Sequence, residues 1–247
     1  MRRFLAFLLL LAVVACGATQ QSEPTVLPAS QTPSPTTAPP MLAPTHTPAT
    51  QSGPVHHAEG AGKWYPAEAH NLQAAVDGYI GQAQVEPQDG RLLAVIVPHA
   101  GYVYSGAVAG RAFRAMQEAG CARRTVVVIG DTHTGSGSAQ IAVWAAGMFE
   151  TPLGTIPVDG QIAQALVDAD PRIQFDRQAF RGEHPVENQL PFIQAVCPDA
   201  QIVPIVIRQP SLENAQLLAN ALLAAIEDGP AHDDVLIVAS TDLSHYH

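Results

Sequence analysis

Apolar residues follow two different patterns along most of this chain. From about residue 56 onward, short continuous apolar runs alternate with segments in which apolar residues recur every three or four positions. Continuous runs of this length are typical of strands that are covered on both faces. We expect such strands at residues 92–97, 125–129, 139–144, 202–207 and 235–239. Pro204 counts against the fourth of them, because proline cannot donate to a strand ladder.

The segments between these strands have helical spacing. It predicts helices over 68–80, 107–119 and 186–196, and further helices that begin after Asp159 and Ser211. Both side chains are of the type that caps a helix N-terminus. Repeated alternation of strand and helix predicts an α/β fold with a mostly parallel sheet and helices on both faces.

The first 55 residues lack this pattern. Arg2 and Arg3 precede an apolar run over 4–14, which is too short to span a bilayer and is typical of a secretion signal. Small residues then lead to Cys16, in a pattern that resembles a bacterial lipobox. We expect residues 1–16 to be a lipoprotein signal peptide, with Cys16 the lipidated residue of an extracytoplasmic protein anchored to the cell membrane. The alternative is an ordinary secretion signal in which Cys16 is incidental.

Residues 17–55 are rich in Pro, Thr, Ser and Gln. Such a segment buries too little apolar surface to offset its ordering entropy. We therefore expect a disordered linker, followed by one folded domain over 56–247. Because the chain ends a few residues after the last expected strand, we expect this domain to be incomplete at its C-terminus.

The charge balance narrows the possible partners. The chain has 12 basic and 22 acidic residues, and its formal net charge is -10. A nucleic-acid binder needs a basic face that neutralises phosphates. We therefore expect no nucleic-acid partner.

Histidines follow three of the expected strands. His99 comes after the strand that ends at Val97, His133 after the strand that ends at Ile129, and His245 after the last strand. The carboxyl ends of parallel strands meet at one edge of a sheet, and ligands bind there in open α/β folds. Neutral imidazole is a ligand for iron, copper and zinc. The spacing therefore indicates a metal or catalytic site.

Carboxylates accompany these histidines. Asp242 lies three residues before His245, and His184 stands between Glu183 and Glu187. A carboxylate beside an imidazole raises the pKa of the ring and makes it a usable proton carrier near neutral pH. We therefore take His245, Asp242, His184 and Glu187 as candidate acid/base residues, and His99 and His133 as candidate metal ligands.

Four motifs carry a family resemblance. They are PHAGYVYSG (98–106), GDTHTG (130–135), EHPVENQLPF (183–192) and STDLSH (240–245), and AGKWYPA (61–67) accompanies them. Together they resemble the Memo family, whose bacterial members are called AmmeMemoRadiSam system protein B. The resemblance covers about residues 58–247. It implies a fold similar to the class III extradiol ring-cleaving dioxygenases, which hold non-haem iron.

The resemblance also implies roles for single residues. His99 and His133 take the place of the family's two metal-binding histidines, and the third ligand is a cysteine beyond residue 247. His245 matches an acid/base histidine, while His184, Glu187 and Asp242 match polar residues of the family's pocket. Cys121 and Cys197 do not match the ligand cysteine; they are either buried thiols or, outside the cytoplasm, a disulfide.

Two functions remain open at this point. The first is a redox enzyme or oxygenase that depends on iron or copper and is tethered to a membrane surface. The second is a non-catalytic module of the same fold that binds a metal or a peptide. The sequence identifies neither the small-molecule or peptide ligand nor the oligomeric state.

Overall fold

A computed structural model describes residues 53–121, 124–227 and 235–243. The expected signal peptide with Cys16, and nearly all of the expected linker, lie outside these ranges, as does His245. The strands, helices and side-chain contacts of the structure belong to these described ranges.

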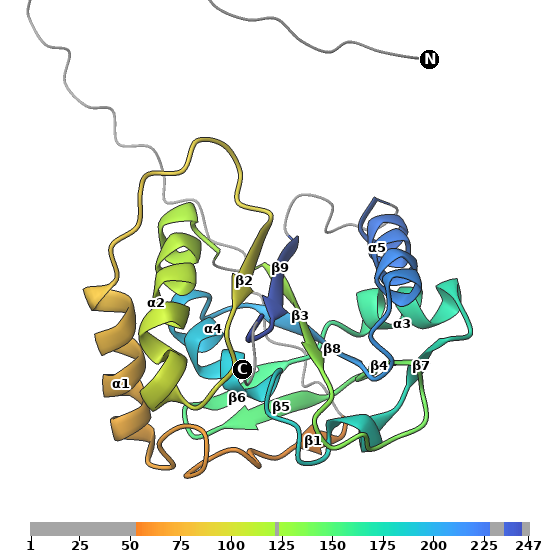
Figure 1. Cartoon of the computed structure of the whole chain (residues 1–247), viewed down its shortest axis with the longest axis horizontal. Coiled ribbons are helices and arrows are strands. Elements are labelled where there is room, and N and C mark those ends of the chain that lie inside the picture. The colour runs from red at the N-terminus through yellow and green to blue at the C-terminus, as the bar shows by residue number, and fades with distance from the viewer. Residues whose placement is uncertain (1–52, 122–123, 228–234, 244–247) are drawn as a thin grey trace, which may run out of the picture. The chain divides into compact units, whose positions relative to one another are not determined.

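A six-stranded sheet forms the centre of the domain (Figure 1). Its order is β2 (Ala94–Val97), β9 (Val235–Ser240), β3 (Thr125–Asp131), β8 (Gln201–Ile207), β4 (Ile141–Val143) and β7 (Ile173–Phe175). Neighbouring strands are parallel except for β4 and β8. The prediction of a mostly parallel sheet is therefore confirmed.

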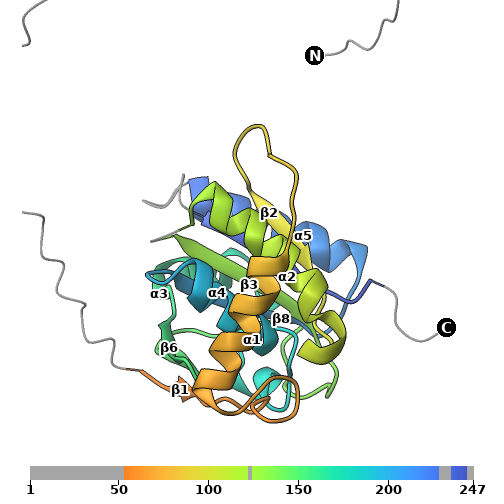
Figure 2. The ribbon, with the colours of Figure 1, turned by 90° about the vertical axis from the view of Figure 1, so that its left-hand side faces the viewer.

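Helices cover both faces of this sheet, as predicted. One face packs against α1 (Ala69–Gln82), α2 (Tyr102–Ala119) and α4 (Leu190–Val196), and Figure 2 shows this layer with α1 in front. The other face packs against α3 (Gly160–Ala169) and α5 (Leu212–Glu227). Successive residues of β3 enter the two cores in turn, because side chains alternate across a strand: Val126 and Val128 join the first core and Val127 the second.

The sequence pattern did not predict a second, three-stranded sheet. It consists of β1 (Val55–His56), β5 (Met148–Thr151) and β6 (Gly154–Pro157), in the order β1-β5-β6. These strands are short and mix polar with apolar residues, so they lack the continuous apolar runs of the main sheet. Two short 3₁₀ helices, η1 (Arg177–Phe180) and η2 (Glu187–Gln189), also interrupt the chain before α4.

The predicted helix caps are present. The Asp159 side chain accepts hydrogen bonds from the backbone N–H groups of Gln161 and Ile162, at 3.1 Å each. Ser211 accepts one from Asn214 N at 3.1 Å, before α5. Helix α2 ends at Ala119 before Gly120, but it begins five residues earlier than the apolar spacing indicated.

The strand expected over 202–207 is present despite Pro204. Pro204 lies within β8, in register with Val128 of β3, and β8 has β3 on one side and β4 on the other. Its carbonyl accepts a hydrogen bond from Trp144 N, one residue beyond the end of β4. The backbone N and C=O of a strand residue point to the same side of the strand. The nitrogen of Pro204, which carries no hydrogen, therefore faces the end of β4. The hydrogen bonds between β8 and β3 need no donor from Pro204 and stay intact.

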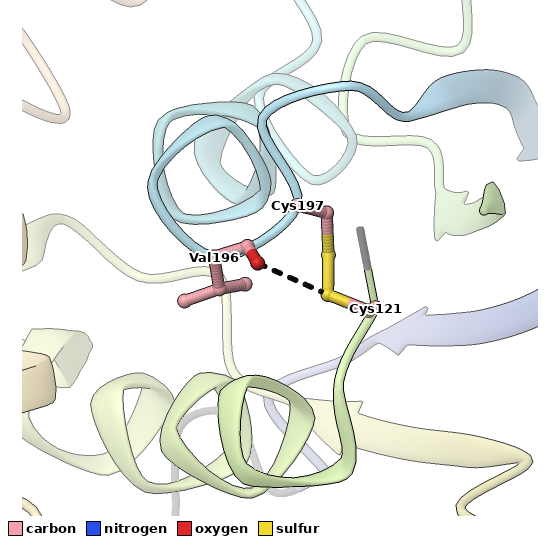
Figure 3. Close-up of a disulfide and its surroundings, with 3 residues drawn as sticks. All are labelled: Cys121, Val196 and Cys197. Atoms are coloured by element: carbon pink, nitrogen blue, oxygen red, sulfur yellow. Dashed lines mark hydrogen bonds between the residues drawn. A yellow bond between two sulfur atoms is a disulfide. The ribbon is translucent and has the colours of Figure 1, made fainter. Parts of the chain in front are cut away.

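The amino edge of the sheet carries a disulfide. Cys121 precedes β3, Cys197 follows α4 and precedes β8, and a bond joins their sulfur atoms across 76 residues of sequence (Figure 3). Of the two alternatives left open by the sequence, buried thiols or a disulfide, the structure has the disulfide. It fixes the end of α4 to the segment that follows α2.

Candidate metal centre

Three imidazoles meet at the opposite, carboxyl edge of the main sheet. His99 lies two residues beyond β2, His133 lies two residues beyond β3, and His184 belongs to the loop that precedes η2. One nitrogen from each ring can be chosen so that all lie within 4.8 Å of one another. The ring centroids are 5.2 Å apart for His99 and His133, 5.5 Å for His99 and His184, and 4.4 Å for His133 and His184.

The sequence analysis placed His99 and His133 together from their positions after parallel strands, and the structure brings these rings together. It grouped His184 with the acid/base residues, whereas here the His184 ring is the third member of the cluster. His184 joins the cluster because the loop over 181–186 returns from η1 toward the carboxyl edge.

Carboxylates and a hydroxyl hold His99. Its backbone N–H donates to Asp242 Oδ1 at 2.7 Å, and Ala100 N donates to the same oxygen at 3.1 Å. Its ring Nδ1 lies 3.1 Å from the Ser240 hydroxyl. Its Nε2 lies 3.8 Å from a carboxylate oxygen of Asp242 and 3.8 Å from one of Asp131. The ring is therefore oriented from one side and faces negative charge on the other.

Glu183 holds the loop that carries His133. Its carboxylate accepts hydrogen bonds from the Thr132 hydroxyl at 2.6 Å, from Thr134 N and the Thr134 hydroxyl at 2.8 Å each, and from His133 N at 2.8 Å. Burial alone would raise the pKa of Glu183, but these hydrogen bonds outweigh it and bring the pKa below its ordinary value. Glu183 is thus an ionised acceptor directly beside His184 in the chain.

Burial favours the neutral form of the His99 and His184 rings. It lowers the pKa of His99, against the opposing effect of Asp242 and Asp131. Burial, with the neighbouring His133 and His99 rings, lowers the pKa of His184 to about 4. A neutral imidazole has a free nitrogen lone pair, which is the form that binds a metal. His99 and His184 are therefore held in the form that can coordinate an ion.

Trp64 forms a wall of the site that the sequence analysis did not assign. Its ring stacks on His184 at a centroid distance of 3.9 Å and an interplanar angle of 13°. A cavity of ≈ 260 Å³ lies beside it, lined by Glu59, Gly60, Lys63, Trp64, Gly182 and Glu183. The AGKWYPA motif, which contains Trp64, was the available signal, but the motif alone did not indicate contact with a histidine 120 residues away.

Glu187 lies apart from the histidine cluster, although the sequence analysis took it as an acid/base candidate. Its buried carboxylate accepts hydrogen bonds from Gly60 N at 2.7 Å, from Glu59 N at 3.1 Å and from the Tyr65 hydroxyl. Its proximity also raises the pKa of the Tyr65 hydroxyl, after the larger effect of burial. The structure thus gives Glu187 the task of fixing the segment around Gly60, since the 3₁₀ turn of η2 directs it there.

The next two residues support the His99 loop and were not predicted either. Asn188 Nδ2 donates to His99 O at 2.7 Å, and Gln189 Nε2 donates to Pro98 O at 3.1 Å and to the Ser240 hydroxyl at 2.9 Å. Both side chains are buried. Segment 183–189 therefore contacts both histidine loops.

The donor set fits a transition-metal ion. Nitrogen ligands of one ion lie closer together than the 4.8 Å limit found here, so small side-chain shifts would close the site around a metal. His99 is buried whereas the His133 side chain is 30% exposed, which leaves one side of the cluster open. Imidazole nitrogens with nearby carboxylates suit zinc, copper, iron or nickel better than calcium or magnesium.

These features define a class of protein: an α/β domain with a candidate metal centre at the carboxyl edge of a mostly parallel sheet. The family model for Memo-like proteins matches residues 56–247. A MEMO1 family protein of Thermotoga petrophila is 38% identical over 195 residues, which cover 75% of this chain and 69% of the relative. A MEMO1 family protein of Pyrobaculum arsenaticum is 38% identical over 192 residues, covering 75% of this chain and 67% of the relative.

A third relative, a MEMO1 family protein of Saccharolobus islandicus, is 40% identical over 152 residues. These cover 61% of this chain and 52% of the relative. The chain belongs to the Memo family. The resemblance drawn from the four motifs is confirmed.

Proposed function

We propose that this protein holds an iron or copper ion between His99, His133 and His184 and uses it in redox chemistry. The observation that carries the proposal is the approach of three ring nitrogens to within 4.8 Å at the edge where α/β proteins bind ligands. A bound iron or copper ion would supply the one-electron chemistry that these side chains lack. His184 enters here as a metal ligand rather than as the acid/base residue expected from the sequence.

The surrounding residues have tasks that depend on their contacts. Asp242 holds the backbone of His99, and together with Asp131 it brings negative charge within 3.8 Å of the ring nitrogen. That charge favours a cation in the cluster. His245, outside the described residues, keeps the role of proton carrier that the family resemblance implies. The exposed side of His133 admits the reactant.

The competing proposal is a non-catalytic module that binds a metal or a peptide. The cavity beside Trp64 favours it, because ≈ 260 Å³ is below the roughly 300–1,000 Å³ of most small-molecule sites. Such a cavity accommodates one side chain of a peptide more readily than a whole aromatic substrate.

Metal analysis and turnover separate these functions. The purified protein, loaded with Fe²⁺ or Cu²⁺, would be assayed for bound metal and for oxygen uptake with a panel of catechols and reductants. Bound metal with turnover supports the redox enzyme, and bound metal without turnover supports the module. A His99→Ala, His133→Ala double variant that keeps all of its metal would contradict both the metal-dependent enzyme and the metal-binding module.

We also propose that the domain is held outside the cytoplasm by a lipid on Cys16. Two features support this: the signal-like pattern over residues 1–16, and the Cys121–Cys197 disulfide, since disulfides persist in oxidising compartments. Within the described ranges, none of the helices has the length and apolar character needed to cross a membrane. Palmitate labelling tests the anchor: a Cys16→Ser variant should lose the label, and persistent labelling would contradict the proposal.

A further inference from the structure

The His133 loop is fastened to the rest of the site through one carboxylate. Thr132, His133 and Thr134 follow the end of β3, and the latter two are exposed. The Glu183 side chain is only 2% exposed, and its carboxylate accepts hydrogen bonds from all three of these residues. A short exposed loop is thus attached to a buried anion from a distant part of the chain.

The Glu183 carboxylate is engaged mainly through one oxygen. Oε1 accepts hydrogen bonds from the Thr132 hydroxyl, from Thr134 N and from the Thr134 hydroxyl. His133 N donates to both oxygens, at 2.9 Å to Oε1 and 2.8 Å to Oε2, and Oε2 lies 3.7 Å from His133 Nδ1. All of these contacts are with the loop that carries His133, so the carboxylate holds this loop.

The position of Glu183 in the chain links two members of the cluster. Glu183 binds the backbone of His133, and the residue joined to it by the next peptide bond is His184. A peptide unit is planar and stiff, so the anchor of one ring and the backbone of the other are connected over a short distance. The His133 and His184 ring centroids are 4.4 Å apart, so the anchor and the two rings lie close together.

We propose that Glu183 is a positioning residue that sets the spacing of His133 and His184 for metal binding. The inference rests on the proposed function, because it assigns Glu183 to the same cluster. Residues that hydrogen-bond to metal ligands keep the ligands in the geometry that a metal requires. Their loss typically lowers metal affinity by about 10- to 100-fold.

Asp176, at the start of η1, provides a matched control because its side chain binds the same loop. It accepts hydrogen bonds from Ser138 N at 2.5 Å and from Ala139 N at 3.0 Å, at the far end of the connection between β3 and β4. It therefore stabilises this connection without contacting the residues next to His133. A general destabilisation of the loop would affect both variants, whereas positioning of the ring involves Glu183 alone.

The experiment compares Glu183→Gln with Asp176→Asn in the full chain. The glutamine keeps the size of the side chain but presents an NH₂ group to at least one of the loop donors. Co²⁺ titration, followed by visible absorption, measures affinity and ligand geometry. Hydrogen exchange at the amides of His133 and Thr134, measured without metal, reports whether the loop is held.

We expect Glu183→Gln to weaken Co²⁺ binding by about 10- to 100-fold and to change the Co²⁺ spectrum. The His133 and Thr134 amides should exchange about tenfold faster or more, because a hydrogen bond to a charged acceptor is lost. Asp176→Asn should leave the affinity within about twofold of the unaltered protein. Unchanged binding or exchange in Glu183→Gln, or an equal loss of affinity in Asp176→Asn, would overturn the proposal.

Two further measurements separate a failure of this inference from a failure of the proposed function or of folding. If the unaltered protein binds no Co²⁺, the proposed function fails, and the exchange rates still decide whether Glu183 holds the His133 loop. If Glu183→Gln does not fold, Thr134→Val replaces it. Thr134→Val removes one of the hydroxyl donors and should weaken Co²⁺ binding by about threefold to tenfold, in proportion to one lost hydrogen bond; no change would contradict the proposal.

Discussion

The two edges of the main sheet are secured in different ways. At the amino edge a covalent bond joins Cys121 to Cys197, next to the starts of β3 and β8. At the carboxyl edge, loops are held by hydrogen bonds to the carboxylates of Glu183 and Asp242, and these leave ring nitrogens of three histidines to face one another. One edge is thus secured by a covalent bond, whereas the other carries the candidate metal centre.

A single segment connects the two edges. Residues 183–189 contact the His99 and His133 loops, α4 follows directly, and Cys197 ends it. The disulfide fixes the far end of this segment, whereas hydrogen bonds fix the near end. The difference suggests that losses at the two edges can be separated experimentally: removal of the disulfide should reduce stability, and removal of site residues should reduce metal binding.

The largest effect is expected from the disulfide. A Cys121→Ser, Cys197→Ser variant should lose about 4 kcal/mol of unfolding free energy, because the bond closes a loop of 76 residues in the unfolded chain. Urea unfolding of the oxidised protein and of the variant measures this. Metal affinity at low temperature should stay within about threefold. A loss of metal binding as large as that of a histidine variant would show that the two edges are not independent.

A smaller effect, confined to metal binding, is expected from His184→Ala. Removal of the third ring should lower metal affinity by at least about 10- to 100-fold, which equals roughly 1.4–2.7 kcal/mol. Isothermal titration with Cu²⁺ under anaerobic conditions measures it. His70→Ala, at an exposed position of α1, is the control and should bind as the unaltered protein does. Full affinity in His184→Ala would remove His184 from the set of ligands.

The smallest effect is expected from the helix cap at the amino edge. Asp159 caps α3 and also accepts a hydrogen bond from the Thr125 hydroxyl at 2.7 Å. Asp159→Ala should cost about 1 kcal/mol of stability, measured by urea unfolding, with no change in metal affinity. Asp168→Ala, an exposed change on the same helix, should cost less than about 0.5 kcal/mol. Equal losses in the two variants would contradict the capping role.

Local patterns in the sequence were sufficient for the main features of the fold. Continuous apolar runs identified most strands of the main sheet, and the side chain of Asp159 identified the start of α3. These features depend on neighbours within a few residues, so they can be read from one stretch of chain. The short strands of the second sheet escaped detection because their stability comes from pairing and from packing against the larger core.

The tertiary structure decided the details of the site. Glu183 and Glu187 lie four residues apart in one motif, yet the first binds the His133 loop and the second binds the segment around Gly60. The sequence could not assign these different partners, because each lies at least 49 residues away. The disulfide is a similar case, since the pairing depends on α2 and α4 ending at the same edge.

The sequence by itself determined where two candidate ligands lie: His99 and His133 follow parallel strands, at one edge of an α/β sheet. Only the tertiary structure added His184 as the third ring and Trp64 as its neighbour. The physical reason is that parallel strands fix the direction in which their ends point, whereas the course of a loop is set by the buried donors and acceptors that it meets.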